Sequence, residues 1–257
     1  MKTQNHLFTL GKIVAVAAVC SIFQNARATL LFDDAFNYTA GSTLGGNINP
    51  GNSIAWTGTS TNMTIVGGNL SYAGLQALGG NQLSMAWSVK TTSINTFANI
   101  TSGQIYYSFL LDMTTPSGGN DYLTALNPGT VTPGGSRDAV DIYVDSSSNL
   151  RLRTVGASET TAAALSLNTT YLVVLEYDFD TANASLFLNP VAGDSQPVAT
   201  ASVTGDGSVA GIDNVGFVSQ ATTGDFLIDD IRVGTTWADV TPVPEPSTLA
   251  LAGLGAL

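Results

Sequence analysis

Between residues 29 and 240 the chain has no window of useful length with helical periodicity, and short strand-like runs recur instead. Thr, Ser, Asn and Gly dominate the segments between these runs, as is typical of turns. The runs that we predict as strands are residues 63–66, 69–72, 83–89, 104–113, 122–126, 139–144, 150–155, 171–179, 184–188, 215–219 and 226–233. The best candidate for a short helix is 159–165, which would make about two turns. This pattern predicts an all-β fold.

Two neighbouring runs have the alternation of a half-buried β-hairpin. Along the first run apolar side chains alternate with Asp141 and Tyr143, and along the second they alternate with Arg151 and Arg153. The polar segment 145–149 joins the two runs and has the length of a hairpin turn. Ten or more short strands, with turns between them and no alternation of strand and helix, favour an antiparallel two-sheet jelly-roll sandwich.

The strand-rich region is expected to form one domain. No linker divides residues 29–240, and a chain of about 210 residues can bury a core that is stable by itself. We find no strict internal repeat in this region. We therefore predict three parts: residues 1–28, a jelly-roll domain over 29–240, and a tail over 241–257.

Residues 1–28 have the features of a secretory signal peptide. A lysine precedes an apolar run over residues 13–23, and Ala26 and Ala28 give the small-x-small pattern of a cleavage site before Thr29. The apolar run is too short for a stable transmembrane helix. We therefore expect an exported protein whose mature chain begins at Thr29.

Removal of the signal peptide changes the composition and excludes several kinds of chemistry. It takes away three of the eight basic residues, leaving five against 19 acids and a net charge of −14. Such a chain lacks the clustered Lys and Arg that nucleic-acid binding needs. Cys20 and His6 are lost as well, which excludes disulfides, Ser-His-Asp catalysis and zinc, haem or iron–sulfur centres.

The tail combines prolines with a short apolar run. Three prolines within five residues favour an extended linker, and the Gly/Ala/Leu run after them is about half a membrane span. The residues of the proline-containing motif are Val243, Pro244, Glu245, Pro246, Ser247 and Thr248. This motif resembles the PEP-CTERM sorting signal of exported bacterial proteins.

The resemblance to PEP-CTERM proteins implies a location and a partner. It implies processing by an exosortase-type transpeptidase and transient membrane association through the tail. It also implies that the protein belongs to the outer cell surface or the extracellular polysaccharide matrix of a Gram-negative-type bacterium. The full transmembrane helix and Arg cluster of that family are absent from this sequence, so either the sequence is truncated or the signal is degenerate.

The order of four segments resembles the concanavalin A-like and laminin-G-like jelly rolls of exported bacterial proteins. These segments are residues 32–38, 171–178, 184–190 and 226–234. The resemblance implies two stacked curved sheets whose first and last strands are paired. The family includes lectins, glycosidases and structural modules, so the fold does not fix a function.

Glu176, Asp178 and Asp180 are the sharpest candidates for catalytic carboxylates. Alternate residues of a strand share one face at about 6.5–7 Å, and glycoside hydrolysis needs a pair of carboxylates. The spacing resembles the Glu-x-Asp-x-Glu of retaining glucanases on this fold, with Asp in the last position. We favour the alternative that residues 178–183 form a hairpin turn in which Asp180 caps backbone N–H groups.

Asp33, Asp34, Asp229 and Asp230 are candidates for a structural calcium site. If the first and last strands pair, their carboxylates meet at one edge, and calcium prefers six to eight oxygen ligands. Related jelly rolls often hold a calcium near the joined termini. The alternative is that these acids are solvated and that no ion is bound.

Exposed aromatic side chains beside Asn or Asp would suit sugar binding by stacking. The candidates are Trp87, Tyr106, Tyr107, Tyr122 and Tyr143. We predict a non-catalytic exported protein of the cell surface or matrix that binds polysaccharide. The alternatives are a glycan-active hydrolase that uses Glu176 and Asp178, and a purely structural or adhesive coat protein.

Overall fold

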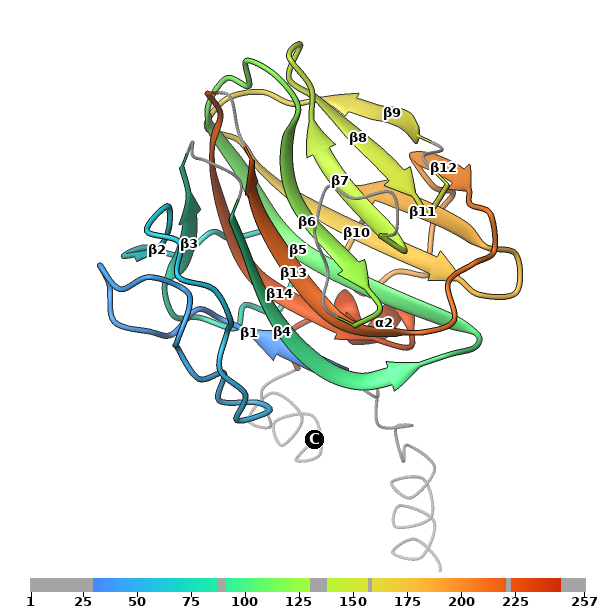
Figure 1. Ribbon diagram of the computed structural model, residues 1–257, viewed down its shortest axis with the longest axis horizontal. Helices are drawn as coiled ribbons and strands as arrows, with labels where there is room; N and C mark the ends of the chain where they lie inside the picture. Colours follow the sequence, from blue (N-terminus) through green and yellow to red (C-terminus); the bar gives the residue numbers. More distant parts are fainter. Residues whose placement is uncertain (1–29, 87–90, 130–137, 157–158, 221–222, 246–257) are drawn as a thin grey trace, which may run out of the picture.

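The computed structural model describes residues 30–86, 91–129, 138–156, 159–220 and 223–245. In these ranges two antiparallel sheets stack face to face, which confirms the predicted all-β sandwich (Figure 1). The eight-stranded sheet runs through β12 (Ala201–Thr204), β11 (Asn183–Leu188), β10 (Thr170–Asp178), β5 (Gln104–Thr115), β14 (Asp225–Gly234), β3 (Gln82–Met85) and β2 (Met63–Val66), and β1 (Leu30–Asp34) pairs with β14. The six-stranded sheet runs through β4 (Thr91–Ile100), β13 (Ile212–Gln220), β6 (Asp121–Asn127), β7 (Val140–Val144), β8 (Asn149–Thr154) and β9 (Glu159–Ala164).

The first and last strands lie side by side, as the sequence predicts. β1 pairs antiparallel with the second half of β14, so that Phe32 lies opposite Val233 and Asp34 lies opposite Ile231. The first half of β14 pairs with β3, and β5 runs along its other edge. β14 therefore ties the beginning and the end of the domain to the middle of the larger sheet.

Apolar side chains fill the space between the two sheets. Along β10, Tyr171, Val173, Leu175 and Tyr177 point into this space, because alternate residues of a strand share one face. Near the paired terminal strands, the ring of Phe32 packs edge-on against Trp56 and other buried aromatics. Burial of this interior is the main favourable contribution to folding.

A second apolar cluster covers the outer face of the eight-stranded sheet. Its members are Leu70, Leu75, Tyr106, Leu110, Leu172, Val174, Phe187, Ala192, Trp237 and Val240. The helix α2 (Trp237–Val240) contributes Trp237, whose ring lies 4.9 Å from that of Phe187 between their centres. This cluster explains why β5 and β10 are apolar on both faces, and it supports the loops that lie over the sheet.

Two local predictions are wrong. Residues 159–165, expected as a short helix, form the edge strand β9, where Glu159 lies opposite Arg153 and accepts a 2.9 Å hydrogen bond from the Tyr143 hydroxyl. Residues 69–72, expected as a strand, form part of a loop that packs on the outer apolar cluster. In both cases contacts with distant residues outweigh the local sequence preference.

Candidate functional site

Asp178 ends β10 at the point where the chain enters a tight turn. Its Oδ1 accepts hydrogen bonds from the N–H groups of Asp180 at 2.8 Å and Thr181 at 3.3 Å. β11 begins at Asn183, so the predicted hairpin is confirmed. The capping carboxylate is nevertheless that of Asp178, and Asp180 lies in the turn.

Glu176 lies on the outer face of the eight-stranded sheet, beneath a loop. The residue is 7% exposed. Its Oε2 accepts a hydrogen bond from Nε2 of Gln196 at 2.9 Å, and its Oε1 lies 3.3 Å from the Tyr106 hydroxyl. Burial raises the pKa of Glu176, and these two hydrogen bonds oppose the rise. The carboxylate therefore joins the sheet to the loop that carries Gln196.

This loop, residues 189–200, connects β11 to β12, and we call it the β11–β12 loop. Three further hydrogen bonds fix its first half. The side-chain oxygen of Asn189 accepts an N–H of β10 at 3.0 Å, and the N–H of Gly193 donates to a carbonyl of the segment after α2 at 2.9 Å. The indole N–H of Trp237 donates to the carbonyl of Asp194 at 3.0 Å. The loop is thus attached to the sheet and to the end of the domain.

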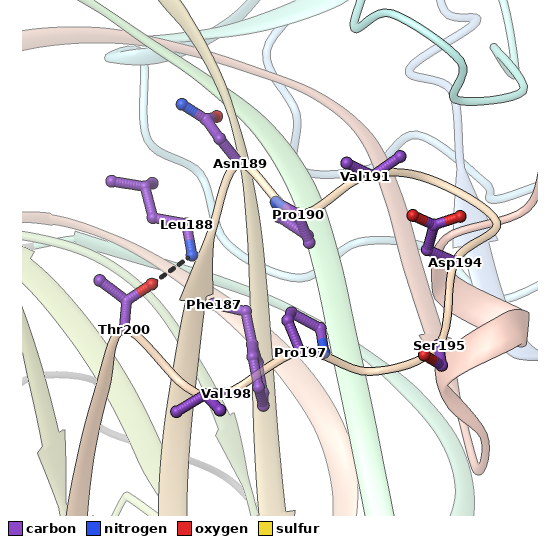
Figure 2. A pocket seen from close by; sticks show the side chains of 10 residues that line it. All are labelled: Phe187, Leu188, Asn189, Pro190, Val191, Asp194, Ser195, Pro197, Val198 and Thr200. Carbon is purple, nitrogen blue, oxygen red and sulfur yellow. Dashed lines mark hydrogen bonds between the residues drawn. The ribbon is translucent and has the colours of Figure 1, made fainter.

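The β11–β12 loop and the end of β11 enclose a pocket of about 290 Å³ (Figure 2). It is lined by Phe187, Leu188, Asn189, Pro190, Val191, Asp194, Ser195, Pro197, Val198 and Thr200. Figure 2 shows the two arms of the loop on either side of the hollow, with Asp194 and Ser195 at the far end. At the near end, Oγ1 of Thr200 accepts the N–H of Leu188 at 3.0 Å and closes the base of the loop.

The lining of the pocket combines apolar walls with a few polar groups. Val191, Pro197 and Val198 present exposed C–H surface, whereas Asp194 and Ser195 contribute a carboxylate and a hydroxyl. A sugar ring has both an apolar C–H face and polar hydroxyls, so this mixture suits it. Among the ten lining residues Asp194 is the one with a carboxylate, whereas glycoside hydrolysis uses two.

The segment after α2 carries the sorting motif away from the domain beside this loop. The carbonyl of Thr241 accepts the N–H of Gly193, and the carbonyl of Pro242 accepts the N–H of Gln76 at 2.8 Å. Val243 then packs over Gly193 so closely that a side chain at Gly193 would collide with it. The motif therefore begins directly at the last contacts of the fold.

Several predicted residues are described only in part or not at all. In the sorting motif, Val243, Pro244 and Glu245 are exposed. The predicted residues outside the described ranges are Ala26, Ala28, Trp87, Pro246, Ser247 and Thr248. No helix in the described ranges has both the length and the apolar character needed to cross a bilayer.

Three of the four acids proposed to hold calcium lie near the buried side chain of Arg232, whose guanidinium donates to the backbone carbonyls of Asp230 and Gln76. Asp33 lies opposite Arg232 in the β1–β14 pair, and Asp229 and Asp230 precede it on β14. Burial lowers the pKa of Arg232, and the three carboxylates oppose this change. Burial and the neighbouring charge of Asp230 raise the pKa of Asp229 to about 8.

The oxygens of these acids also accept hydrogen bonds within the fold. Asp229 and Asp230 accept backbone N–H groups of the loop before β3 at 2.8 and 3.1 Å. Asp34 accepts the N–H of Phe36 at 2.7 Å and the indole N–H of Trp56 at 2.8 Å. In the described part of the chain no three His, Cys, Asp or Glu side chains form a group able to hold a metal ion. Calcium binding by these acids stays a prediction.

The aromatic residues proposed to stack on sugars are mostly covered. Tyr107 is in the core, where its hydroxyl lies 2.9 Å from Oγ1 of Thr124. Tyr106 is part of the apolar cluster under the β11–β12 loop. Tyr143 is 3% exposed and packs against Tyr122, with 5.2 Å between the ring centres. Tyr106, Tyr107 and Tyr143 are therefore too buried to stack on a sugar, whereas stacking by the partly exposed Tyr122 stays a prediction.

The outer face of the six-stranded sheet carries a network of ion pairs. Its residues Asp141, Arg151 and Arg153 alternate with buried apolar residues, as the hairpin pattern predicts. Nε of Arg153 donates to both carboxylate oxygens of Asp141 at 3.1 and 3.0 Å, and its guanidinium lies 4.9 Å from the ring centre of Tyr122. Arg151 pairs with Glu159 at 3.1 Å on the next strand. Burial alone would lower the pKa of Arg153, but the hydrogen bonds and charge of Asp141 raise it.

Comparison with known protein families gives a match for the C-terminal residues of the chain. Residues 242–257 match the family model of the PEP-CTERM protein-sorting motif. This motif indicates an exported protein that is sorted to the cell surface, and it implies processing by an exosortase. A search of curated proteins finds no significant match to the chain.

Comparison with solved structures addresses the fold. The catalytic domain of a glycoside hydrolase family 131 protein from Coprinopsis cinerea is similar with a TM-score of 0.50 and 10% identity, covering 83% of this chain and 97% of that one. A sialidase is similar with a TM-score of 0.50 and 12% identity over 83% of this chain, which spans 19% of the sialidase. The exoplasmic/lumenal domain of VIP36 has a TM-score of 0.42 and 8% identity, covering 73% of this chain and 85% of that one. At these identities the two matches with a TM-score of 0.50 show the fold alone, a two-sheet β-sandwich.

Proposed function

We propose that this protein is a non-catalytic protein of the outer cell surface or extracellular matrix that binds a polysaccharide in the pocket of the β11–β12 loop. The observation that carries the proposal is the pocket itself, whose loop is attached at Asn189, Gly193, Asp194 and Gln196 before any ligand arrives. A preformed pocket avoids much of the entropy cost of ordering a loop on binding. The PEP-CTERM motif supports this location outside the cell, and the proposal includes exosortase processing and transient membrane association through the tail.

The size and chemistry of the pocket support a polymer as the ligand. Its volume of about 290 Å³ is at the small end of the range for ligand pockets, which suits one or two units of a longer chain. The lining residues Val191 and Val198 are 66% and 94% exposed, so the apolar lining of the pocket extends to its rim on both arms of the loop. Further sugar units would contact this surface.

Hydrolysis by Glu176 and Asp178 is the alternative activity. Both carboxylates would then have to face the same substrate. Glu176 is covered by Gln196 and Tyr106, and Asp178 accepts two N–H groups of its own turn. These contacts support a structural role for both acids and therefore the non-catalytic proposal.

The proposal is tested by filling the pocket. Ser195→Trp places a large side chain among the lining residues, and Ser146→Trp adds the same side chain on the exposed β7–β8 turn of the other sheet. We expect the purified protein to bind at least one polysaccharide from a panel of neutral, acidic and amino polymers. Ser195→Trp should weaken that binding at least tenfold, and Ser146→Trp should leave it within twofold.

Two results would contradict the proposal. Failure of the purified protein to bind any polymer would favour the purely structural alternative. Equal binding by the wild-type protein and Ser195→Trp would place the binding surface elsewhere. Circular dichroism of both variants shows whether the sandwich has formed.

A further inference from the structure

The charge of the pocket comes from a single carboxylate. Asp194 is the one ionisable residue among those that line it, and it is exposed. Its backbone is held by the indole N–H of Trp237, which donates to the carbonyl of Asp194 at 3.0 Å. The carboxylate thus stands on a fixed part of the loop, and in Figure 2 its oxygens point away from Ser195. A carboxylate in this position forms its strongest hydrogen bonds with a cation.

The arginines of the described ranges all have partners within the fold. Arg232 is 2% exposed and donates to the backbone carbonyls of Gln76 and Asp230, and Arg153 and Arg151 are paired with Asp141 and Glu159 on the other sheet. None of these arginines lines the pocket. With five basic residues against 19 acids after removal of residues 1–28, the protein has a negative field that repels polyanions and attracts polycations.

We infer that the pocket selects polysaccharides built from amino sugars with free ammonium groups over neutral, N-acetylated or uronic-acid polymers. The ammonium group of one unit pairs with the Asp194 carboxylate, and the C–H face of the ring lies on the exposed side chains of Pro197 and Val198. This inference rests on the proposed function of the same pocket and names the class of polymer that it binds.

A matched pair of oligosaccharides tests the inference. A β-1,4-linked glucosamine hexamer and its fully N-acetylated counterpart share one backbone and differ in the ammonium groups. In calorimetric titrations of the purified protein at pH 5.5 and 50 mM NaCl, we expect the glucosamine hexamer to bind at least tenfold more tightly. The difference should shrink in 500 mM NaCl, because salt screens an exposed ion pair.

Two charge variants locate the effect. Asp194→Asn removes the carboxylate in the pocket, whereas Asp180→Asn removes an equal charge from the β10–β11 turn. That turn lies at the opposite end of β11, roughly 20 Å away for six residues of strand and beyond the Debye length of about 8 Å at physiological salt. We expect Asp194→Asn to weaken binding of the glucosamine hexamer at least fivefold and Asp180→Asn to change it less than twofold.

The outcomes separate this inference from the proposed function. Equal or tighter binding of the N-acetylated hexamer overturns the inference, as do equal effects of Asp194→Asn and Asp180→Asn. Binding of a neutral glucan that Ser195→Trp abolishes, together with no preference for ammonium groups, overturns the inference and leaves the proposed function intact. If Ser195→Trp affects no polymer, the proposed function fails as well.

Discussion

At the scale of single residues, Glu176 controls how firmly the β11–β12 loop is attached. In Glu176→Gln one side-chain oxygen is replaced by an amide nitrogen, so one of the two acceptors that face Gln196 and Tyr106 is lost. We expect the free energy of unfolding to fall by about 1 kcal/mol. Amide hydrogen exchange over residues 189–200 should become faster. Urea denaturation and hydrogen-exchange mass spectrometry measure the two effects.

Asp178→Asn is the matched control for this change. Asn keeps the Oδ1 that accepts the N–H groups of Asp180 and Thr181. We therefore expect a loss below about 0.5 kcal/mol and no change in exchange of the β11–β12 loop. A larger loss in Asp178→Asn than in Glu176→Gln would contradict the anchoring role of Glu176.

Asp229 makes stability depend on pH in the neutral range. Its folded pKa of about 8 lies above the ordinary value of 3.8, because burial and the charge of Asp230 disfavour the ionised form. The folded protein therefore binds this proton more tightly than the unfolded chain does. The resulting stabilisation is fully present below the ordinary pKa and is lost as pH rises through about 8. We expect the melting temperature to fall between pH 5 and pH 9.

The composition makes this pH effect measurable. The single histidine, His6, lies in the predicted signal peptide, so residues 29–257 contain no histidine that would titrate in the same range. Asp229→Asn should flatten the dependence of melting temperature on pH, as followed by scanning calorimetry. A wild-type profile that is level between pH 5 and pH 9, or an unchanged slope in Asp229→Asn, would refute the assignment to this carboxyl.

At the scale of elements, β1 holds the start of the domain to its last strand through one buried ring. Phe32 is 3% exposed, and its ring centre lies 5.9 Å from that of Trp56. Phe32→Ala should cost about 3–5 kcal/mol, because it leaves a cavity in the core. Leu30→Ala, on the same strand but at a site 41% exposed, should cost less than about 1 kcal/mol. Guanidinium denaturation of both variants provides the comparison, and similar losses would mean that β1 is not held by its inward face.

The sequence predicts best those elements whose own residues carry the signal. The alternation of Asp141 and Tyr143 with buried apolar residues identifies β7, and its pairing with β8 follows from a short polar turn. β4 and β12 were not predicted, because their polar sequences are stabilised by neighbouring strands. Partner strands are a property of the fold, so a local pattern does not reveal them.

The candidate site was harder to predict for the same reason. Glu176 was singled out as an acid, but its partner Gln196 is 20 residues away and belongs to no motif. The acids Asp33, Asp34, Asp229 and Asp230 were predicted to meet at one edge; Asp33, Asp229 and Asp230 each act on the charge of Arg232, but in the described ranges they form no group able to hold a metal ion. Arg232 follows Asp230 by two residues on the same strand, but its pairing with Asp33 depends on the β1–β14 register, which a local pattern does not reveal.

At the scale of the whole molecule, Gly193 sets the path by which the chain leaves the domain. Its φ is +81°, and a side chain there would collide with Val243. Gly79 has a similar φ of +77° and open space around it. Gly79→Ala should lose about 1 kcal/mol through backbone strain alone. Gly193→Ala should lose at least about 1 kcal/mol more, because it also displaces Val243.

Limited proteolysis reports the displacement directly. In Gly193→Ala we expect faster cleavage after Thr241 than in Gly79→Ala, since the contacts of Gly193 hold that segment. Equal cleavage rates in the two variants would show that Gly193 does not restrain the tail.

The exit of the tail beside the pocket also sets the geometry of any attachment to the cell. From Val243 to the proline-flanked Glu245 there are three residues, roughly 10 Å of extended chain. If the domain were joined to an anchor at this motif, the connecting segment would be shorter than the domain is wide. The β11–β12 loop would then face the point of attachment. A polymer held in the loop would then be pressed close to the envelope, and the six-stranded sheet would be left facing the surroundings. Such a molecule would hold a polysaccharide coat against the cell envelope.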